Sequence, residues 1–382
     1  MDFDYSDEQK QLRDSIVRFA RGELNRDVVE RDREEAFSRD IWKKCAEVGL
    51  LGLPAPEDWG GSGADPLTCA IALEALGYGC KDGGLTFSIA AHVLACVVPV
   101  WQHGSSAQKD RWLRGLCDGS VIGAHAITEP DSGSDTFAMR TRAERIDGGW
   151  RLQGSKTFVS NAPVADVVIV FAVTDSSKGF HGGVTAFLVD RSLPGFSAGQ
   201  RFAKMGLRTA PIGELVFDGM VVPDSAILGS VGGGAAIFGT AMDWERALLV
   251  AAHVGTIERL LETSTAYARS RQQFGQPIDK FQAVAHKIAD MKVQLEAARL
   301  LVYRTASRLT TTRSISLDAS IAKLFVSESL VRAALDAVQL HGGYGYMAEY
   351  DVERALRDAI GATIYSGTSE MQRNMIARWL GL

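Results

Sequence analysis

Apolar residues in the first third of the chain recur at helical spacing. Leu12, Ile16 and Phe19 are separated by four and then three residues, which is typical of one face of an amphipathic helix. The pattern predicts further helices over residues 38–49, 65–79 and 85–103. Residues 54–63 interrupt these helices with prolines and glycines, which favour a loop. We therefore expect an α-helical domain over residues 1–120.

The middle of the chain changes to short runs that are rich in β-branched residues. These runs cover residues 167–173, 184–189 and 214–217, with Val221 and Val222 following the last run. Turns that contain glycine or aspartate separate them, for example at 147–149 and 180–183. We expect a β domain over residues 121–225.

Beyond the triple glycine at 232–234 the pattern is helical again as far as the C-terminus. Apolar residues three or four positions apart continue for six turns: Ile288, Met291, Leu295, Ala298, Val302, Ala306 and Leu309. Such a stripe predicts a long amphipathic helix. We expect a second helical domain over residues 226–382, and hence the order α, β, α along the chain.

Composition narrows the class of protein. The chain has 382 residues, of which 46% are hydrophobic and 23% are charged, as in an ordinary globular protein with a large core. The net charge is −5, and no run of Lys and Arg is concentrated enough to bind a polyanion. Nucleic acid is therefore not an expected partner.

Cysteine usage and the apolar segments bear on localisation. The five cysteines form no Cys-x-x-Cys pair, so we expect reduced thiols and no disulfide framework or metal site: Cys45, Cys69, Cys80, Cys96 and Cys117. Residues 1–8 are acidic and lack the basic and apolar regions of a signal peptide. The most apolar stretch, residues 87–101, is shorter than the ~20 residues that span a bilayer. We expect a cytoplasmic protein without membrane insertion.

Three strings of residues carry candidate chemistry. Residues 126–135 read Ala-Ile-Thr-Glu-Pro-Asp-Ser-Gly-Ser-Asp, and exposed backbone N–H groups in such a turn can hold a phosphate. On local chemistry alone, a polar surface turn is the simpler interpretation. Residues 154–162 read Gly-Ser-Lys-Thr-Phe-Val-Ser-Asn-Ala, where the aromatic side chain can cover a flat ring or simply pack in the core. Residues 364–372 read Ile-Tyr-Ser-Gly-Thr-Ser-Glu-Met-Gln.

These strings resemble the signatures of the acyl-CoA dehydrogenase family, and the resemblance covers essentially all 382 residues. It implies an α+β multidomain fold with an N-terminal helical domain, a middle antiparallel β domain and a C-terminal four-helix bundle. It also implies that the protein binds FAD and assembles as a homotetramer, in which a neighbouring subunit completes each FAD site.

The chain departs from the family pattern at Ser366, where most members carry the catalytic glutamate. A serine hydroxyl cannot act as the base near neutral pH. Glu245, directly before Arg246, resembles the helix glutamate that serves as base in the isovaleryl-CoA dehydrogenase branch. We therefore expect Glu245 to be the base. A solvated helix residue or half of an ordinary ion pair are the alternatives for this glutamate.

The resemblance also assigns residues to FAD. On the β domain it implicates the residues that lie along the flavin and pyrophosphate: His125, Ile127, Thr128, Gly133, Ser134, Phe158 and Ser160. In the C-terminal domain it implicates two strings, Arg-x-x-Phe-Gly and Gln-x-x-Gly-Gly-x-Gly, with residues near them: Arg271, Gln273, Phe274, Gln282, Gln339, Gly342, Gly343, Thr368 and Glu370.

The implied reaction is α,β-dehydrogenation of an acyl thioester. Glu245 would remove the α-proton while the β-hydrogen leaves as hydride to the flavin, and the Ser366 backbone N–H would bind the enolate oxygen. Substrate contacts are expected from Ser134, Asp243, Arg246 and Gly367. The acyl group can be carried by CoA or by a carrier protein, and prolyl thioesters are substrates of a similar branch. Electron-transfer flavoprotein or oxygen would accept the electrons.

Other interpretations remain open at the sequence level. The same fold hosts flavin oxidases and monooxygenases, and a non-catalytic FAD-binding homologue is favoured if Glu245 points away from the flavin. His92 lies in an apolar run and His341 lies in a glycine-rich turn, so both are expected to be structural. No spacing of His, Cys or carboxylate residues suggests a metal site.

Overall fold

The computed structural model describes residues 5–312 and 314–382. Residues 1–4 of the acidic N-terminal segment lie outside this range. Helices make up the first part of the chain: α1 Asp7–Phe19, α2 Val28–Glu34, α3 Arg39–Glu47, α4 Pro66–Gly79, α5 Gly83–His92, α6 Val98–His103, α7 Ser106–Gln108 and α8 Arg114–Asp118. The predicted helices over 38–49 and 65–79 correspond to α3 and α4.

Local signals in the sequence explain where these helices begin. The Asp65 carboxylate accepts hydrogen bonds from the backbone N–H groups of Leu67 and Thr68, at 2.9 and 3.0 Å, and Pro66 occupies the first turn of α4. Ser6 and Gln9 form a reciprocal capping box at the start of α1. Both helices therefore begin at residues that satisfy their free N–H groups.

The predicted helix over residues 85–103 is confirmed, and it extends beyond the apolar stretch of residues 87–101. Residues Gly83–His103 form one helical segment of 21 residues, long and apolar enough to cross a membrane, but 89% of its most apolar window is buried inside the protein. It is therefore a core helix. His92 lies at its centre, donates from Nε2 to the Leu116 carbonyl at 2.9 Å and accepts from the Gly123 N–H at 3.0 Å, which confirms that it is a satisfied core residue.

The middle of the chain forms a sheet with one short helix. Its elements are β1 Gly123–Ala126, β2 Arg142–Ile146, β3 Gly149–Ser160, β4 Val167–Val173, α9 Phe180–Gly183, β5 Val184–Asp190, β6 Phe196–Arg201, β7 Ile212–Pro223 and β8 Ile227–Leu228. The strand order is β6-β7-β3-β2-β4-β5-β8, and β1 pairs with β4. The sheet is mixed and not purely antiparallel as predicted, because β1 and β2 both run parallel to β4.

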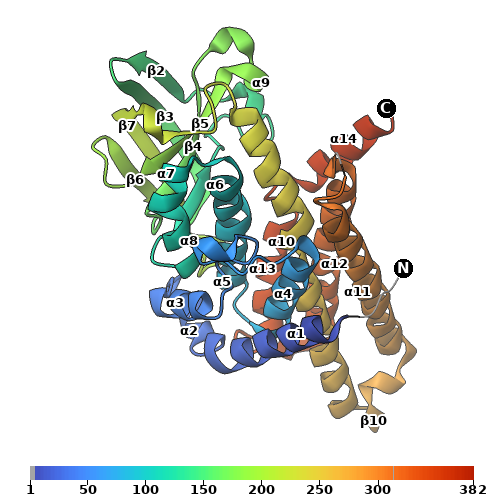
Figure 1. Cartoon of the computed structure of the whole chain (residues 1–382). Helices are drawn as coiled ribbons and strands as arrows, with labels where there is room; N and C mark the ends of the chain where they lie inside the picture. Colours follow the sequence, from blue (N-terminus) through green and yellow to red (C-terminus); the bar gives the residue numbers. More distant parts are fainter. Residues whose placement is uncertain (1–4, 313) are drawn as a thin grey trace.

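The C-terminal part is helical: α10 Gly234–Ser270, α11 Gln282–Arg308, α12 Ser316–His341, α13 Asp351–Ala362 and α14 Ser369–Trp379, with a hairpin of β9 Gln272–Gln273 and β10 Gln276–Pro277. The three longest helices run side by side, and the sheet lies at the end of α10 opposite to β10 (Figure 1). The predicted long helix over 288–309 is α11.

One large core joins the first helices to the C-terminal ones, and smaller cores lie on the two faces of the sheet. Gly77 of α4 and Gly255 of α10 sit where these helices cross. A Cβ at Gly77 would collide with the Ala252 carbonyl, and one at Gly255 would collide with the Glu74 carbonyl. The close crossing therefore requires glycine at both positions, and it fixes α10 against the N-terminal helices.

Candidate active site

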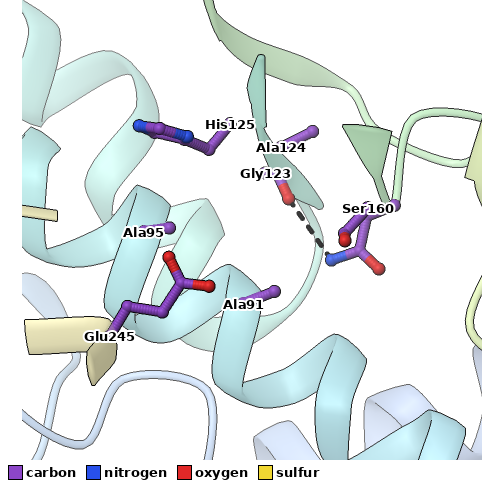
Figure 2. A pocket seen from close by; sticks show the side chains of 8 residues that line it. Ala91, Ala95, Gly123, Ala124, His125, Ser160 and Glu245 are labelled. Atoms are coloured by element: carbon purple, nitrogen blue, oxygen red, sulfur yellow. Dashed lines mark hydrogen bonds between the residues drawn. The ribbon is translucent and has the colours of Figure 1, made fainter. Parts of the chain in front are cut away.

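A small cavity lies where α10, the apolar helical segment Gly83–His103 and the sheet meet. The Glu245 carboxylate points into it from α10, and the cavity has a volume of about 60 Å³ (Figure 2). Its walls are built from small side chains, glycine and a few polar groups: Ala91, Ala95, Gly123, Ala124, His125, Ser160 and Asn161. The small residues at 91 and 95 leave the space in front of the carboxylate open.

Ser366 reaches the same carboxylate from the turn between α13 and α14. Its hydroxyl donates to Glu245 Oε1 at 2.6 Å. Ser366 has φ of +55°, which places it in the left-handed region that non-glycine residues seldom adopt. The next residue, Gly367, has φ of +90°. The backbone thus turns sharply at the position where the family usually carries its base.

Three side chains hold this turn through its two carbonyl groups. Arg246 Nε donates to the Ser366 carbonyl at 3.1 Å, and Lys323 Nζ donates to the Gly367 carbonyl at 2.7 Å. Gln372 Nε2 donates to both carbonyls, at 3.2 and 3.0 Å. The left-handed conformation of Ser366 is therefore fixed by contacts from α10, α12 and α14.

The electrostatics of the carboxylate follow from its burial. Glu245 is 8% exposed, and loss of solvent raises its pKa above the ordinary glutamate value, although the Ser366 hydroxyl and the charges of Arg246 and Lys323 act in the opposite direction. Burial also lowers the pKa of Lys323 to about 8. Asp243, half-buried one turn earlier than Arg246, has a raised pKa because it is desolvated.

Both alternatives for Glu245 are wrong. The residue is buried and not solvated. Among the described ion pairs none joins Glu245 to its neighbour Arg246, whose Nε instead bonds the Ser366 carbonyl. The carboxylate also does not point away from the candidate flavin strings, because His125 and Ser160 line the same cavity.

A buried ion pair links the two strings of the sheet region. Lys156 Nζ donates to Glu129 Oε1 at 2.7 Å and to the Ile127 carbonyl at 3.0 Å. Lys156 is 0% exposed, and burial lowers its pKa to about 8 despite the opposing carboxylate. Glu129 also accepts from the Arg140 and Thr141 backbone N–H groups. The pair fixes the turn after β1 against β3.

The remaining predicted residues of this region surround that pair. Ile127 is buried, and the Thr128 carbonyl accepts from the Thr157 N–H at 2.9 Å. Gly133 and Ser134 are exposed on the turn. Phe158 has φ of +54° and is 64% exposed, so the alternative of simple core packing is wrong.

His125 is half-buried and has one buried ring nitrogen that is not hydrogen-bonded to a described residue. Its ring lies 4.9 Å from Phe171 and 6.2 Å from Phe238, measured between ring centroids. Desolvation, with the charge of Lys156 adding to it, lowers its pKa to about 4, so the imidazole is neutral near pH 7. Its Nε2 has no partner among the described residues.

A second, wider cavity lies near the hairpin. It has a volume of about 550 Å³, and the predicted residues that line it are Arg271, Gln273, Gly342 and Gly343. The Arg271 guanidinium lies 5.5 Å from the centroid of the Tyr344 ring. His341 also lines this cavity, but its Nδ1 is bonded to the Ala337 carbonyl at 2.7 Å and its ring stacks on Tyr267 at 4.2 Å, in keeping with a structural residue.

The structure does not bring all predicted site residues together. Phe274 is 92% exposed beside the wide cavity, and Gln282 and Gln339 are also exposed. Thr368 caps α14 by accepting from the Met371 N–H at 3.3 Å, with Glu370 exposed on the same helix. One group of residues surrounds the small cavity at Glu245, whereas Arg271, Gln273 and Phe274 follow directly after the C-terminal end of α10.

Sequence reasoning assigned no part to several residues of this site. Lys323 is the clearest omission, and a signal existed, since it occupies the same helical stripe as the apolar Ala319 and Val326. Gln372 gave no comparable signal, because its two acceptors become neighbours only when the turn forms. Ala91 and Ala95 read as ordinary core residues until Glu245 lies opposite them.

Three family models match successive parts of the chain. The chain matches the acyl-CoA dehydrogenase N-terminal domain over residues 6–120, the middle domain over 124–220 and the C-terminal domain over 232–381. It is 42% identical over 382 residues to an L-prolyl-[peptidyl-carrier protein] dehydrogenase from Serratia sp., with 100% of this chain and 99% of that protein covered.

Two solved structures are also similar. The prolyl acyl carrier protein oxidase AnaB has a TM-score of 0.97 at 44% identity, with 99% of this chain and 100% of AnaB covered. The structure described as PigA with FAD and proline has a TM-score of 0.97 at 41% identity, with 100% of both chains covered. Because the matches extend over the whole chain at this level of identity, the protein belongs to the acyl-CoA dehydrogenase family.

Proposed function

We propose that this protein catalyses the FAD-dependent α,β-dehydrogenation of an acyl thioester, with Glu245 as the base. The observation that carries this proposal is the buried Glu245 carboxylate, which faces a small cavity shared with His125 and Ser160. A raised pKa makes the carboxylate a stronger base when it receives the α-proton. Family membership and the relatives described above agree with the reaction type.

The residues of the chain fit FAD. His125 offers a buried ring nitrogen that no described residue bonds, and Phe158 offers an aromatic face that is exposed on the protein surface. A Cβ at Gly342 or Gly343 would meet open space, so the wide cavity beside Arg271 admits a ligand close to the backbone. When bound, the flavin would accept the β-hydrogen of the substrate as hydride. Phosphate groups would be held by Ser134 and by Arg271.

The chain supplies the proton-transfer side of the reaction. Glu245 would take the α-proton, and the negative charge that develops on the thioester oxygen would be met by the Ser366 backbone N–H. No described residue accepts a hydrogen bond from this N–H group. Arg246, Lys323 and Gln372 hold the turn in the conformation that presents it.

We infer that the acyl group is small and compact. A cavity of about 60 Å³ admits roughly four to six water-sized atoms, since each needs about 10–15 Å³ on this measure. A compact group such as a five-membered ring is more in keeping with a cavity of this size than a long straight chain is. A prolyl group on a carrier protein is thus the first substrate to test, as the relatives named above suggest, with short acyl-CoA thioesters as the comparison.

Anaerobic mixing with thioesters tests the proposal. Loss of flavin absorbance on addition of prolyl-carrier protein, with weaker or no response to a long-chain acyl-CoA, is the expected result. A flavoprotein that no thioester reduces would overturn the proposed reaction. Reduction by an external donor alone would favour the flavin oxidase or monooxygenase alternative instead.

Further features of the proposal concern the acceptor, the assembly and the domains. Electron-transfer flavoprotein or oxygen would reoxidise the flavin, and stopped-flow reoxidation by each separates the two. We propose a cytoplasmic homotetramer with domains at residues 1–120, 121–225 and 226–382. The change from helices to strands between α8 and β1, and back to helix at α10, supports these boundaries.

A further inference from the structure

We propose that the side-chain hydroxyl of Ser366 positions Glu245, by holding one carboxylate oxygen and favouring its ionised form. This inference rests on the proposed function, since it concerns the base of that reaction. It gives the Ser366 side chain a second role, separate from the proposed role of its backbone N–H group. The serine at this position then compensates for the burial of the base that replaces the usual glutamate.

The geometry of the contact carries the proposal. Ser366 Oγ lies 2.6 Å from Glu245 Oε1, a short separation of the kind found when a hydroxyl donates to a carboxylate. The serine hydroxyl has a single proton, so this bond uses its whole donor capacity. The second carboxylate oxygen remains available to take the α-proton from a substrate in the cavity.

The turn makes the hydroxyl a rigid partner and not a freely rotating one. Ser366 is held at φ of +55° because its carbonyl accepts from Arg246 and Gln372. The following carbonyl accepts from Lys323 and again from Gln372. These contacts anchor the backbone on both sides of the serine Cα atom, so the direction of its Cβ, and with it the reach of the hydroxyl, is set by three helices.

Several groups face Glu245, and their effects differ in sign. Burial raises its pKa, while Arg246 on the same helix and Lys323 on α12 lower it from a distance. Tyr365, partly buried in the turn beside Ser366, and His125 across the cavity are both neutral near pH 7. Ser366 is the only described residue that donates a hydrogen bond directly to the carboxylate. Removing the hydroxyl therefore leaves the carboxylate with distant charges alone.

The test compares Ser366→Ala with Ser366→Gly. Both remove the hydroxyl, but glycine relieves the positive φ and alanine does not, so a shared effect cannot come from backbone strain. The single-turnover rate of flavin reduction is followed against pH. Below the pKa of Glu245 the base is protonated and the rate falls. We expect this acid limb to move to higher pH by about one unit in both variants, and the plateau rate to fall about 10-fold.

A second measurement does not depend on turnover. Infrared difference spectra would record the carboxylic acid C=O stretch of Glu245 during a pH titration, with Glu245→Gln identifying the band. The band should appear at higher pH in both Ser366 variants than in the parent protein. If no thioester reduces the parent flavoprotein, the proposed function fails, but this titration still reports on the contact between Ser366 and Glu245.

Two controls complete the design. Ser366→Thr retains a hydroxyl and should return the acid limb and the infrared band toward the parent pH. Ser307→Ala removes a hydroxyl that bonds only a carbonyl on the exposed face of α11, and should change neither. Parent-like acid limbs and infrared titrations in both Ser366→Ala and Ser366→Gly would overturn the proposal, as would a shift in one of them alone.

Discussion

Position 366 shows how one substitution changes the demands on a neighbour. A glutamate there would itself be the base, whereas a serine must leave that part to another residue. Glu245 is buried beside it, and burial alone keeps a carboxyl group protonated to higher pH. The serine hydroxyl offsets part of that effect because it donates to the ionised carboxylate. The two residues are therefore best understood as a pair.

Glu245→Gln should remove the proposed base and leave FAD bound. Glutamine keeps the size of the side chain and can still accept from Ser366, so FAD should remain bound. We expect flavin reduction by thioester to fall by roughly 10²–10⁴-fold, measured anaerobically in a single turnover. Asp243→Asn is the comparison variant, because this nearby half-buried carboxylate is the second candidate for the base, although it does not line the cavity. Full activity of Glu245→Gln, with loss in Asp243→Asn, would move the base to Asp243.

The buried ion pair of Lys156 and Glu129 joins the turn after β1 to strand β3. Lys156→Met leaves the Glu129 carboxylate buried without its cation, which costs about 3–5 kcal/mol and should lower the apparent Tm by about 4–6 °C. FAD should be retained less well in gel filtration, since the strings on both sides of the pair lose their connection. Lys178→Met, in an exposed ion pair with Asp175, should leave the Tm and FAD unchanged.

At the scale of elements, hydrophobic periodicity and composition predicted most of the regular secondary structure. The run Val167–Val173 is β4 over the same residues, because a fully apolar β-branched run suits a strand buried on both faces. The runs at 214–217 and 221–222 are one strand, β7, which bulges at Asp218 and Gly219: Gly219 has φ of +61°, and the register against β3 shifts there. β2 and β3 were not predicted from pattern, because charged residues such as Arg142 and Glu144 alternate on their open face.

The site could be predicted from the sequence only in part, because some of its residues are distant along the chain and meet only in the fold. Glu245 and the strings near the flavin are contiguous in sequence and so were recognisable. Lys323, Gln372 and the alanines at 91 and 95 acquire their contacts only when separate helices meet at one turn. No local pattern encodes which carbonyl a distant side chain will bond.

The crossing of α4 and α10 makes an element-scale prediction. Gly77→Ala should force the helices apart, because its Cβ has no space beside the Ala252 carbonyl. Overpacking of this kind costs about 1–3 kcal/mol, or about 1–4 °C in apparent Tm for a chain of this length. Gly239→Ala, in the open part of α10 where nothing lies within 4 Å of the added atom, should instead leave the Tm equal or slightly raised. Equal losses in both variants would mean that the crossing is not tight.

For the whole molecule, the distance between the two groups of predicted FAD residues is decisive. Glu245 lies 25 residues before Ser270, the last residue of α10, so about 38 Å of helix separates the small cavity, towards the sheet end, from the end at Arg271. Figure 1 shows the sheet and β10 at these opposite ends. One dinucleotide cannot reach from the small cavity to the wide cavity of the same chain. Both groups can serve one FAD only if two chains meet.

Mixed assemblies test this arrangement directly. Glu245→Gln alone should bind FAD but lack the base, and Arg271→Ala alone should bind FAD more weakly by about 1.5–3 kcal/mol, through loss of a charge-assisted phosphate contact. When the two variants are co-expressed with different affinity tags and isolated together, some sites should combine the Glu245 of one chain with the Arg271 of the other. We expect those assemblies to recover flavin content and thioester-dependent reduction above either variant alone.

The same experiment can also contradict the shared site. If each FAD were bound by a single chain, every site in the mixture would carry one of the two defects, and activity would not exceed that of the better parent. Arg269→Ala, two positions earlier on α10 and outside the lining of the wide cavity, should replace Arg271→Ala in a control mixture with Glu245→Gln. That control chain should already be active alone, so mixing should only dilute it. Recovery confined to the Arg271 mixture follows only if neighbouring chains share the site, because complementation requires each chain to supply what the other lacks.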